Sequence, residues 1–503
     1  MKTDRFFNTD HLNPDIKRIT VRGGAITSIA QVAKQLLTIA STVVLARILT
    51  PQDYGLVAMV TAVTGFVALF KDMGLSMATI QRPEINHEQV STLFWVNVLI
   101  SVFVCLITMG IAPLVSWYYH EARLVKITMI LAIGFLFSGL MIQHQALLRR
   151  QMRFKVLVAI EIISMALGIV SAIIMALKGF GYWSLVVLNL GTQMVMALCA
   201  WVLCPWRPGR PGSIKSVMDM LKFGGNLTGF NIINYFSRNL DNILIGRFYG
   251  SQQLGLYSKA YGLLLLPIRQ INGPILSVAL PAFSRLFSEP DRYRKNYLRL
   301  LEKLAILTMP GIMFLIVTSD WLIFAVLGPQ WTGAAKIFLF LGIAGLVQPI
   351  ANTTGMLFIT QDRTHHQLRW GFASGLLSII AIVAGLPWGV VGVAASYAIS
   401  GLLIRTPLLF WYIGRSGPVR TLDFYTACKP GAIVALVIAF CLYSFRLLFE
   451  IQNPYIGLTA SLIFTIAMGF ITLLLFPSGR RALRDMQSIM PMFATAASQS
   501  GSK

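Results

Sequence analysis

Charged residues are scarce in this sequence, and acidic ones are scarcer than basic ones. Only 12% of the 503 residues are charged, with 19 Asp and Glu against 42 Lys and Arg, whereas an ordinary soluble domain carries about 25%. Hydrophobic residues make up 56% of the chain. This balance excludes an ordinary soluble enzyme and predicts that most of the chain lies in a lipid bilayer.

Cysteine is also rare, and the five cysteines show no spacing that would bind a metal. All of them lie within or beside apolar runs, at Cys105, Cys199, Cys204, Cys428 and Cys441. We expect packing residues there, and we expect neither a metal nor a cofactor. The net charge of +23 does not predict a nucleic-acid partner, because the cations are spread over alternate loops and form no basic domain.

Apolar runs long enough to cross a bilayer, about twenty residues each, recur along the chain and predict an all-α polytopic membrane protein. The first 22 residues carry five cations and no short apolar core before a cleavage site, so we expect an uncleaved start. Hydropathy places about fourteen transmembrane helices near residues 25–48, 54–71, 91–115, 124–148, 156–177, 182–204, 224–247, 253–275, 303–320, 335–360, 369–386, 388–412, 430–449 and 455–476.

The distribution of basic residues between the loops predicts the orientation. Of the 42 Lys and Arg, 30 lie in segments on the side of the N-terminus and 7 in segments on the other side, with five inside helices. Cytoplasmic loops of membrane proteins carry the excess of Lys and Arg, so both termini are predicted to be cytoplasmic. The longest loops, 205–222 and 276–303, fall on that side. The short outward loops leave no room for a catalytic domain, so an enzyme is not expected.

The chain matches itself at a separation of about 200 residues, as parallel repeats in transporters do. Gly23-Gly24 corresponds to Gly224-Gly225, Ala46-Arg47 to Gly246-Arg247, and Gly55-Leu56 to Gly255-Leu256. We expect two six-helix lobes and two added helices. The predicted parts are a cytoplasmic segment 1–22, an N-lobe 23–204, a cytoplasmic linker 205–222, a C-lobe 223–412, an added helix pair 413–476 and a cytoplasmic tail 477–503.

Polar residues form one stripe on the first helix and one on its repeat partner. Their three- and four-residue steps place each set on a single helix face, which lipid cannot cover. An ionised side chain at the bilayer centre costs about 2.5–3.5 kcal/mol, so these faces predict a hydrated, net cationic cavity that favours an anionic ligand. The candidate cavity residues are Gln31, Lys34, Thr38, Asn231, Asn234, Arg238, Asp241 and Lys259.

Three further cations, Arg47, Arg269 and Arg405, are additional candidates for this cavity. Other interpretations stay open for several of these residues. Arg238 and Asp241, three positions apart, can pair with each other on one helix, and Arg269 and Arg405 can reach the cytoplasmic surface instead. Glu161, six residues into the fifth predicted helix, can likewise lie at the membrane interface, and no role is assigned to it.

Several motifs resemble a known family. They are Leu45-Ala46-Arg47-Ile48-Leu49-Thr50-Pro51-Gln52-Asp53-Tyr54-Gly55, Leu147-Leu148-Arg149-Arg150-Gln151-Met152-Arg153-Phe154, Leu254-Gly255-Leu256-Tyr257-Ser258 and Gly328-Pro329-Gln330-Trp331. With them the chain resembles polysaccharide repeat-unit flippases of the Wzx type, in the multidrug/oligosaccharidyl-lipid/polysaccharide exporter superfamily, and in particular the WzxC-like branch. The likeness spans roughly residues 20 to 370, and Asp362 departs from the glycine expected in related sequences.

The resemblance implies a pair of six-helix lobes like those of the multidrug exporters. It also implies transport of an undecaprenyl-pyrophosphate-linked oligosaccharide across the bacterial inner membrane, by alternating access, for exopolysaccharide, capsule or O-antigen assembly. A pyrophosphate cannot cross hydrocarbon unaided, and a cationic interior would replace its hydration. Expected partners are this lipid-linked cargo and membrane lipids, with a coupling proton or sodium ion and polysaccharide-assembly proteins as further candidates.

Other functions remain open from the sequence. An ion-coupled antiporter of drugs or small molecules in the same superfamily would favour interior carboxylates, which are few here. A membrane-embedded polysaccharide polymerase, or a polyprenyl-dependent glycosyltransferase, would need a sizeable outward loop. A peptidoglycan-precursor flippase would share both the fold and the charge of the cavity.

Overall fold

The computed structural model describes residue 7 and residues 16–72, 74–82, 84–213, 218–475 and 479–480. Within these ranges every regular element is a helix and none is a strand, which confirms the predicted all-helical class. By its internal contacts the chain divides into two units, which are Met1–Gly255 (unit 1) and Leu256–Lys503 (unit 2).

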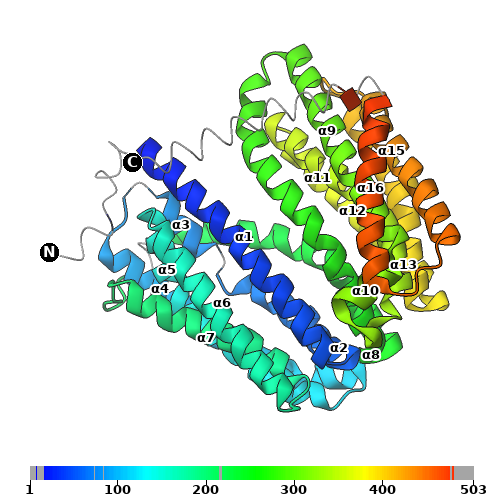
Figure 1. Cartoon of the computed structure of the whole chain (residues 1–503). Coiled ribbons are helices and arrows are strands. Elements are labelled where there is room, and N and C mark those ends of the chain that lie inside the picture. The colour runs from blue at the N-terminus through cyan, green and yellow to red at the C-terminus, as the bar shows by residue number, and fades with distance from the viewer. Residues whose placement is uncertain are drawn as a thin grey trace, which may run out of the picture. The chain divides into compact units, whose positions relative to one another are not determined.

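Unit 1 holds seven helices and the first part of an eighth within the described residues. In Figure 1 the helices α4 to α7 run alongside one another, and α6 also packs on α1. The helices are α1 (Ile16–Ile48), α2 (Pro51–Val67), α3 (Leu75–Gln81), α4 (His87–Tyr119), α5 (Arg123–Arg150), α6 (Phe154–Leu177) and α7 (Trp183–Leu203).

The starts of α2 and α4 follow directly from their sequences. The Thr50 side chain accepts a hydrogen bond from the backbone N–H of Asp53, and the Asp53 carboxylate accepts one from the backbone N–H of Thr50. Pro51, the first residue of α2, has no N–H that needs a partner. Asn86 and Gln89 form the same reciprocal capping pair at the start of α4. These capping motifs fix the residues at which α2 and α4 begin.

Two helices that meet at a kink join the two units along the chain, and together they carry the label α8 (Met218–Leu286). The sequence predicted two helices here, 224–247 and 253–275, and the non-helical dihedral angles at Gly250 confirm a break between them. The φ angle of Gly250 is +75°, a conformation that glycine adopts without steric cost. The predicted break therefore exists as a kink at one glycine and not as a loop.

Unit 2 contains the remainder of α8 and the rest of the described helices. They are α9 (Pro290–Val317), α10 (Ser319–Leu327), α11 (Ala334–Thr360), α12 (Thr364–Gly385), α13 (Gly389–Ile399), the π-helical turn η7 (Ser400–Arg405), α14 (Thr406–Gly414), α15 (Thr421–Leu448) and α16 (Pro454–Leu475). Helix α9 packs against both α15 and α11, and these helices lie side by side in Figure 1.

The segment 276–303, predicted as the longest loop, is helical almost throughout. Helix α8 continues to Leu286 and α9 begins at Pro290, so only residues 287–289 connect them. The prediction was wrong because hydropathy detects the apolar part of a helix, and the polar extensions of these two helices carry no such signal. Buried Tyr293 and Tyr297 hold the extension of α9 against its neighbours.

Twelve helices in the described part of the chain are long and apolar enough to cross a membrane. Two of them, Asn239–Leu286 and Thr364–Gly414, have 48 and 51 residues, and each covers parts of two predicted spans. At about 1.5 Å per residue either one exceeds twice the hydrocarbon thickness of about 30 Å. A count of fourteen crossings therefore fits these lengths but stays a prediction.

Two repeat-equivalent turns contact each other within unit 1, and the contact is reciprocal. A Cβ atom added to Gly55 would lie 1.6 Å from the carbonyl oxygen of Ser251, and one added to Gly255 would lie 1.8 Å from that of Pro51. Positions 51 and 251, like 55 and 255, are equivalent at the 200-residue offset. Such an exchange of contacts is what a local two-fold relation produces, which supports the internal duplication.

The unit boundary after Gly255 lies further along the chain than the predicted linker 205–222. The early part of α8 belongs to unit 1, where the Tyr235 hydroxyl donates to the carbonyl oxygen of Ala62 at 2.7 Å. The start of the linker is held there too, because buried Trp206 donates to His87 at 3.1 Å. These contacts explain why the contact-based boundary follows the linker and falls inside α8.

Ion pairs at both ends fasten α15 to its neighbours in unit 2. Near its start Asp423 receives two hydrogen bonds from Arg294 of α9, at 2.7 and 2.6 Å. At its end Arg446 donates to both oxygens of Asp320 at 2.9 and 2.6 Å. The helix pair that lacks a repeat partner is thus anchored on unit 2 at both membrane boundaries.

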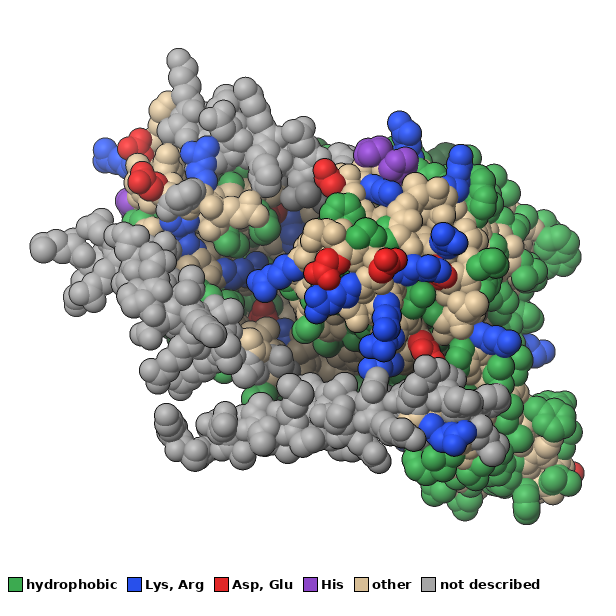
Figure 2. Space-filling model, turned by 90° about the horizontal axis from the view of Figure 1, so that it is seen from above, with side chains coloured by type: hydrophobic (Ala, Val, Ile, Leu, Met, Phe, Trp, Pro, Cys, Tyr) green, Lys and Arg blue, Asp and Glu red, His purple; other side chains and the backbone are tan. Residues whose placement is uncertain are grey.

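Basic side chains occur at the end of unit 2 where α9 begins. Figure 2 looks onto the end where α9 begins, and it shows Lys and Arg scattered among a few acidic residues, with hydrophobic side chains on the flanks. This distribution is typical of the cytoplasmic end of a membrane bundle. The orientation in the cell stays a prediction.

Candidate functional site

The interior of unit 1 holds an ion pair between two membrane-spanning helices. The ammonium of Lys34 on α1 lies 2.6 Å from the carboxylate Oε2 of Glu161 on α6, and the two side chains are 27% and 31% exposed. The sequence had left an interfacial position open for Glu161, and had expected Lys34 to need water or an anion. The structure supplies that anion from the protein itself, because the Glu161 carboxylate pairs with Lys34.

The pairing of Glu161 had a detectable signal in the sequence. Glu161 is the only acidic residue of α6, a helix of 24 residues that is otherwise strongly apolar. A lone carboxylate within a membrane-spanning helix needs a partner, and α6 has just one other charged residue, Lys155, near its start. The sequence thus indicated that Glu161 needs a partner, but it did not show which of the cations inside helices lies beside α6.

The hydroxyl groups of the α1 stripe are satisfied by their own helix. Thr38 donates to the carbonyl oxygen of Lys34 at 2.8 Å, and Thr27 donates to that of Gly23 at the same distance. Gln31 is exposed and Thr38 is partly buried. The stripe therefore offers Lys34 and Gln31 as groups that can reach a ligand, and its threonine hydroxyls can still accept hydrogen bonds.

The second stripe lies on α8, and only part of it can be located. Asn231, Asn234 and Arg238 belong to α8, but their side chains lie outside the described part of the structure. Asp241 is buried, with an exposed fraction of 6%, and its Oδ1 accepts a hydrogen bond from the backbone N–H of Asn242 at 2.8 Å. The proposed pairing of Arg238 with Asp241 stays a prediction.

In unit 2, Arg405 points into the helical interior. Its guanidinium donates to the Ser378 hydroxyl of α12 at 2.7 Å and to the Tyr397 carbonyl at 2.9 Å, and it lies 4.2 Å from the centre of the Tyr397 ring. Tyr397 precedes Arg405 by two helical turns, on the side away from the nearer helix end at Gly414. The side chain thus turns back along the helix and does not extend towards the helix end at Gly414.

The π-helical turn η7 places Arg405 at the end of its six residues, Ser400–Arg405. Such turns widen a helix locally and often occur at functional sites. Of the five N–H donors of the guanidinium, two are used by Ser378 and Tyr397, and the buried Nε atom has no hydrogen-bond acceptor within the described residues. Among the cations of unit 2, Lys259 is partly buried on α8, whereas Arg269 is exposed.

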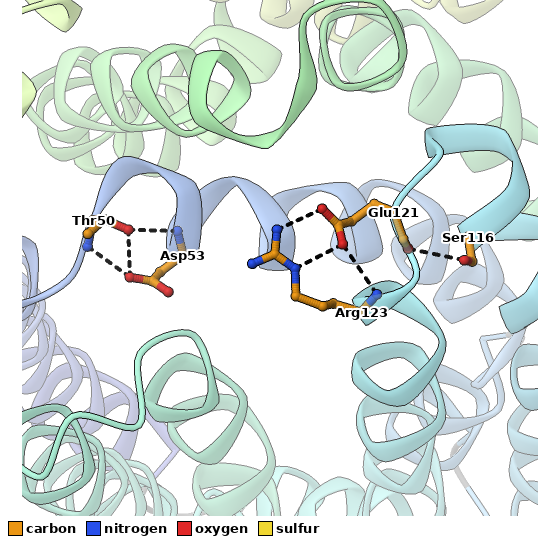
Figure 3. A network of polar contacts seen from close by, with 5 residues as sticks. All are labelled: Thr50, Asp53, Ser116, Glu121 and Arg123. Carbon is orange, nitrogen blue, oxygen red and sulfur yellow. Dashed lines mark hydrogen bonds and ion pairs between the residues drawn. The ribbon is translucent and has the colours of Figure 1, made fainter.

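A separate polar network lies in unit 1 where α2 and α5 begin. Figure 3 shows the Thr50–Asp53 cap of α2 and the Glu121–Arg123 pair between α4 and α5. Arg123 donates to the two carboxylate oxygens of Glu121 at 2.8 and 2.7 Å. These side-chain hydrogen bonds lower the pKa of Glu121 below its ordinary value of 4.5. Arg47 is exposed in the last turn of α1, beside this network and away from Lys34.

The structure thus brings some predicted site residues together and leaves others apart. Lys34 and Thr38 share one region of α1, and Arg405 is enclosed by α12 and α13. Arg47 and Arg269 are exposed near helix ends or surfaces. Within the described residues no group of three metal-ligating side chains occurs.

Comparison with known proteins places the chain in a family. A profile of a family described as "Polysaccharide biosynthesis protein" matches residues 44–336, which is more than half of the chain. The teichuronic acid biosynthesis protein TuaB of Bacillus subtilis (strain 168) is 30% identical over 85% of this chain and 89% of its own length. The lipopolysaccharide biosynthesis protein WzxC of Escherichia coli (strain K12) is 26% identical over 74% of this chain and 76% of its own.

Among solved structures, the fold is similar to that of the lipid II flippase MurJ in an inward closed conformation. The TM-score is 0.72, with 15% identity, over 88% of this chain and 97% of the other. At this identity the similarity shows the fold alone. The chain belongs to the family of polysaccharide biosynthesis proteins, and the predicted likeness to its WzxC-like members is confirmed.

Proposed function

We propose that this protein is a flippase for undecaprenyl-pyrophosphate-linked oligosaccharide repeat units in the bacterial inner membrane. It would serve exopolysaccharide, capsule or O-antigen assembly, with both termini in the cytoplasm. Its family and the names of its relatives, which refer to teichuronic acid and lipopolysaccharide biosynthesis, support a cargo built of sugars. The flippase fold of MurJ supports movement of a lipid-linked substrate.

The observation that carries the proposal is the partly exposed ammonium of Lys34 inside a membrane-spanning helix. An ammonium has three N–H donors, and the bond to Glu161 uses one of them. The other two are free to bind a phosphate oxygen. The anionic diphosphate needs such donors because it loses its hydration on the way through the bilayer.

The same reasoning assigns roles to the other candidate residues. Arg238, Lys259 and Arg405 add positive charge, and the side chains of Gln31, Thr38, Asn231 and Asn234 form hydrogen bonds with phosphate or sugar. Asp241, a buried carboxylate, is the candidate for binding a coupling proton or sodium ion. The polyprenyl tail stays in lipid while the two lobes expose the cationic site alternately to either side, in the manner of other transporters built from repeats.

Transport by the purified protein tests the proposal. Proteoliposomes containing defined undecaprenyl-pyrophosphate-linked oligosaccharides, with and without proton and sodium gradients, should show movement of the cargo between leaflets. Lys34→Gln should reduce the rate about tenfold or more, since a charge-assisted hydrogen bond contributes about 1.5–3 kcal/mol. Lys178→Gln, at an exposed position after α6, is the matched control. Equal rates for Lys34→Gln and wild type would contradict the proposal.

An ion-coupled antiporter of cationic small molecules is the second candidate, and one observation favours it. Besides Asp53 and Glu88 in the first turns of α2 and α4, unit 1 places two carboxylates further inside membrane-spanning helices, Glu161 and Asp241, where the sequence had suggested one deep carboxylate. The same proteoliposomes discriminate the two functions. Uptake of cationic drugs with no movement of lipid-linked oligosaccharide would favour the antiporter.

A further inference from the structure

A pocket of about 560 Å³ opens at the end of unit 2 opposite the basic face. It lies where α9 ends, α11 begins and α15 ends, so it sits at the boundary of the membrane-spanning segments. Its wall is largely apolar and includes Ile316, Val317, Leu339, Tyr443 and Leu447. Charged groups occur there as well, which makes the pocket amphiphilic.

The charges of this pocket leave one cation without a partner. Three charged residues line it, Asp320, Lys336 and Arg446, and Asp320 is bound by Arg446, which also lies 4.0 Å above the Trp321 ring. No ion pair or hydrogen bond joins the Lys336 ammonium to another group in the described part of the chain. The charged side chains therefore give the pocket a net positive charge, and Lys336 is the cation that can bind a ligand.

An apolar track leads from the pocket into the membrane-spanning part of α15. Leu436, Phe440, Tyr443 and Leu447 follow at three- and four-residue steps on one face, and each is more than 60% exposed. From Leu436 to Leu447 the helix rises about 16 Å at about 1.5 Å per residue. This matches one leaflet of a hydrocarbon core about 30 Å thick.

We propose that the pocket binds an anionic phospholipid of the bilayer. The phosphodiester contacts Lys336, and an acyl chain lies along the exposed face of α15. The position at the span boundary suits a headgroup, the length of the track suits one leaflet, and the unpaired cation favours an anionic over a zwitterionic lipid. By the predicted orientation this is the outer leaflet. The proposal does not depend on transport and goes beyond the proposed function.

Lipid titration of the full-length protein in detergent, read by native mass spectrometry, tests this site. Phosphatidylglycerol should bind more tightly than phosphatidylcholine with the same chains. Lys336→Gln should weaken the tightest phosphatidylglycerol site about fivefold and Lys336→Glu about thirtyfold, which corresponds to about 1 kcal/mol per charge. Lys178→Glu, at an exposed lysine of unit 1, should leave this binding unchanged.

A second variant and two further ligands keep the test decisive. Leu339→Trp, which fills the pocket, should weaken binding of both phospholipids, and glycerol phosphate without acyl chains should not compete. Equal binding of phosphatidylglycerol to wild type and Lys336→Glu would overturn the proposal. So would a site that prefers undecaprenyl phosphate over phosphatidylglycerol, because the pocket would then belong to the cargo and not to the bilayer.

Discussion

The two units place a cation in their interiors but compensate its charge differently. In unit 1 the Lys34 ammonium is paired with the Glu161 carboxylate. In unit 2 the Arg405 guanidinium is held by a hydroxyl, a backbone carbonyl and an aromatic ring, all of them neutral. One interior is thus locally balanced and the other keeps a positive charge. The two units therefore differ in the electrostatics around their interior cations.

The largest loss of stability is expected at the reciprocal contact between the repeat-equivalent positions Gly55 and Gly255. Gly55→Ala would drive a methyl group into the Ser251 carbonyl, and Gly255→Ala would do the same at Pro51. Because backbone must move in both cases, each variant should lose about 3 kcal/mol or more of stability, measured by thermal unfolding in detergent. Gly110→Ala, where no atom lies within 4 Å of an added Cβ, is the control. Unequal losses for Gly55→Ala and Gly255→Ala would break the equivalence of the two turns.

The second prediction concerns the balanced interior. Removing either partner of the Lys34–Glu161 pair should destabilise unit 1, and a double-mutant cycle with Lys34→Met and Glu161→Gln should give a coupling energy of about 1 kcal/mol. That value lies between exposed and buried pairs, because both side chains are about one third exposed. Additive effects of the two substitutions would show that the pair contributes no stability.

The third prediction concerns the interior that keeps its charge. Arg405→Lys retains the charge but cannot reproduce the two-point contact with Ser378 and Tyr397, so it should cost about 1–2 kcal/mol of stability. Ser378→Ala removes only one of these hydrogen bonds and should cost about half as much. If Arg405→Lys were as stable as wild type, the simultaneous hydrogen bonds of the guanidinium to Ser378 and Tyr397 would not contribute to stability.

The smallest effect is expected at the Glu121–Arg123 pair, which lies outside the membrane-spanning segments. The pKa of Glu121 is lowered in the folded protein, so its stabilisation is present above pH 4.5 and is lost as the pH falls through the folded value. The pair is partly exposed, which limits its contribution to about 0.5 kcal/mol. Glu121→Gln should remove this part of the acid destabilisation measured between pH 5 and pH 3.

The sequence predicted those parts of the fold that carry a strong hydrophobic signal. The apolar runs gave the helices α4 to α7 within a few residues, and the 200-residue offset identified Gly55 and Gly255. The prediction of a loop at 276–303 failed at the polar extensions of α8 and α9, because hydropathy reports which residues suit a lipid environment and does not report the length of a helix. The break between the predicted helices 224–247 and 253–275 was confirmed at Gly250, but its form was not predicted, since a glycine between two apolar runs indicates a loop as readily as a bend.

The candidate site was predicted only in part, for a related reason. A polar stripe shows which face of α1 avoids lipid, and it identified Lys34 correctly as an interior cation. It could not show what lies opposite, so Glu161 on α6 was missed. For Arg405 the sequence left two directions open, and the packing of Tyr397 and Ser378 around η7 decides between them.

The central claim is that the Lys34 ammonium donates hydrogen bonds to the anionic cargo in addition to pairing with Glu161. The exchange variant Lys34→Glu with Glu161→Lys tests it most directly, because it preserves the ion pair and moves the cation to α6. We predict a variant with nearly the stability of wild type that transports lipid-linked oligosaccharide at a strongly reduced rate in proteoliposomes. Transport at the wild-type rate would contradict the account, since the pair would then serve the fold alone.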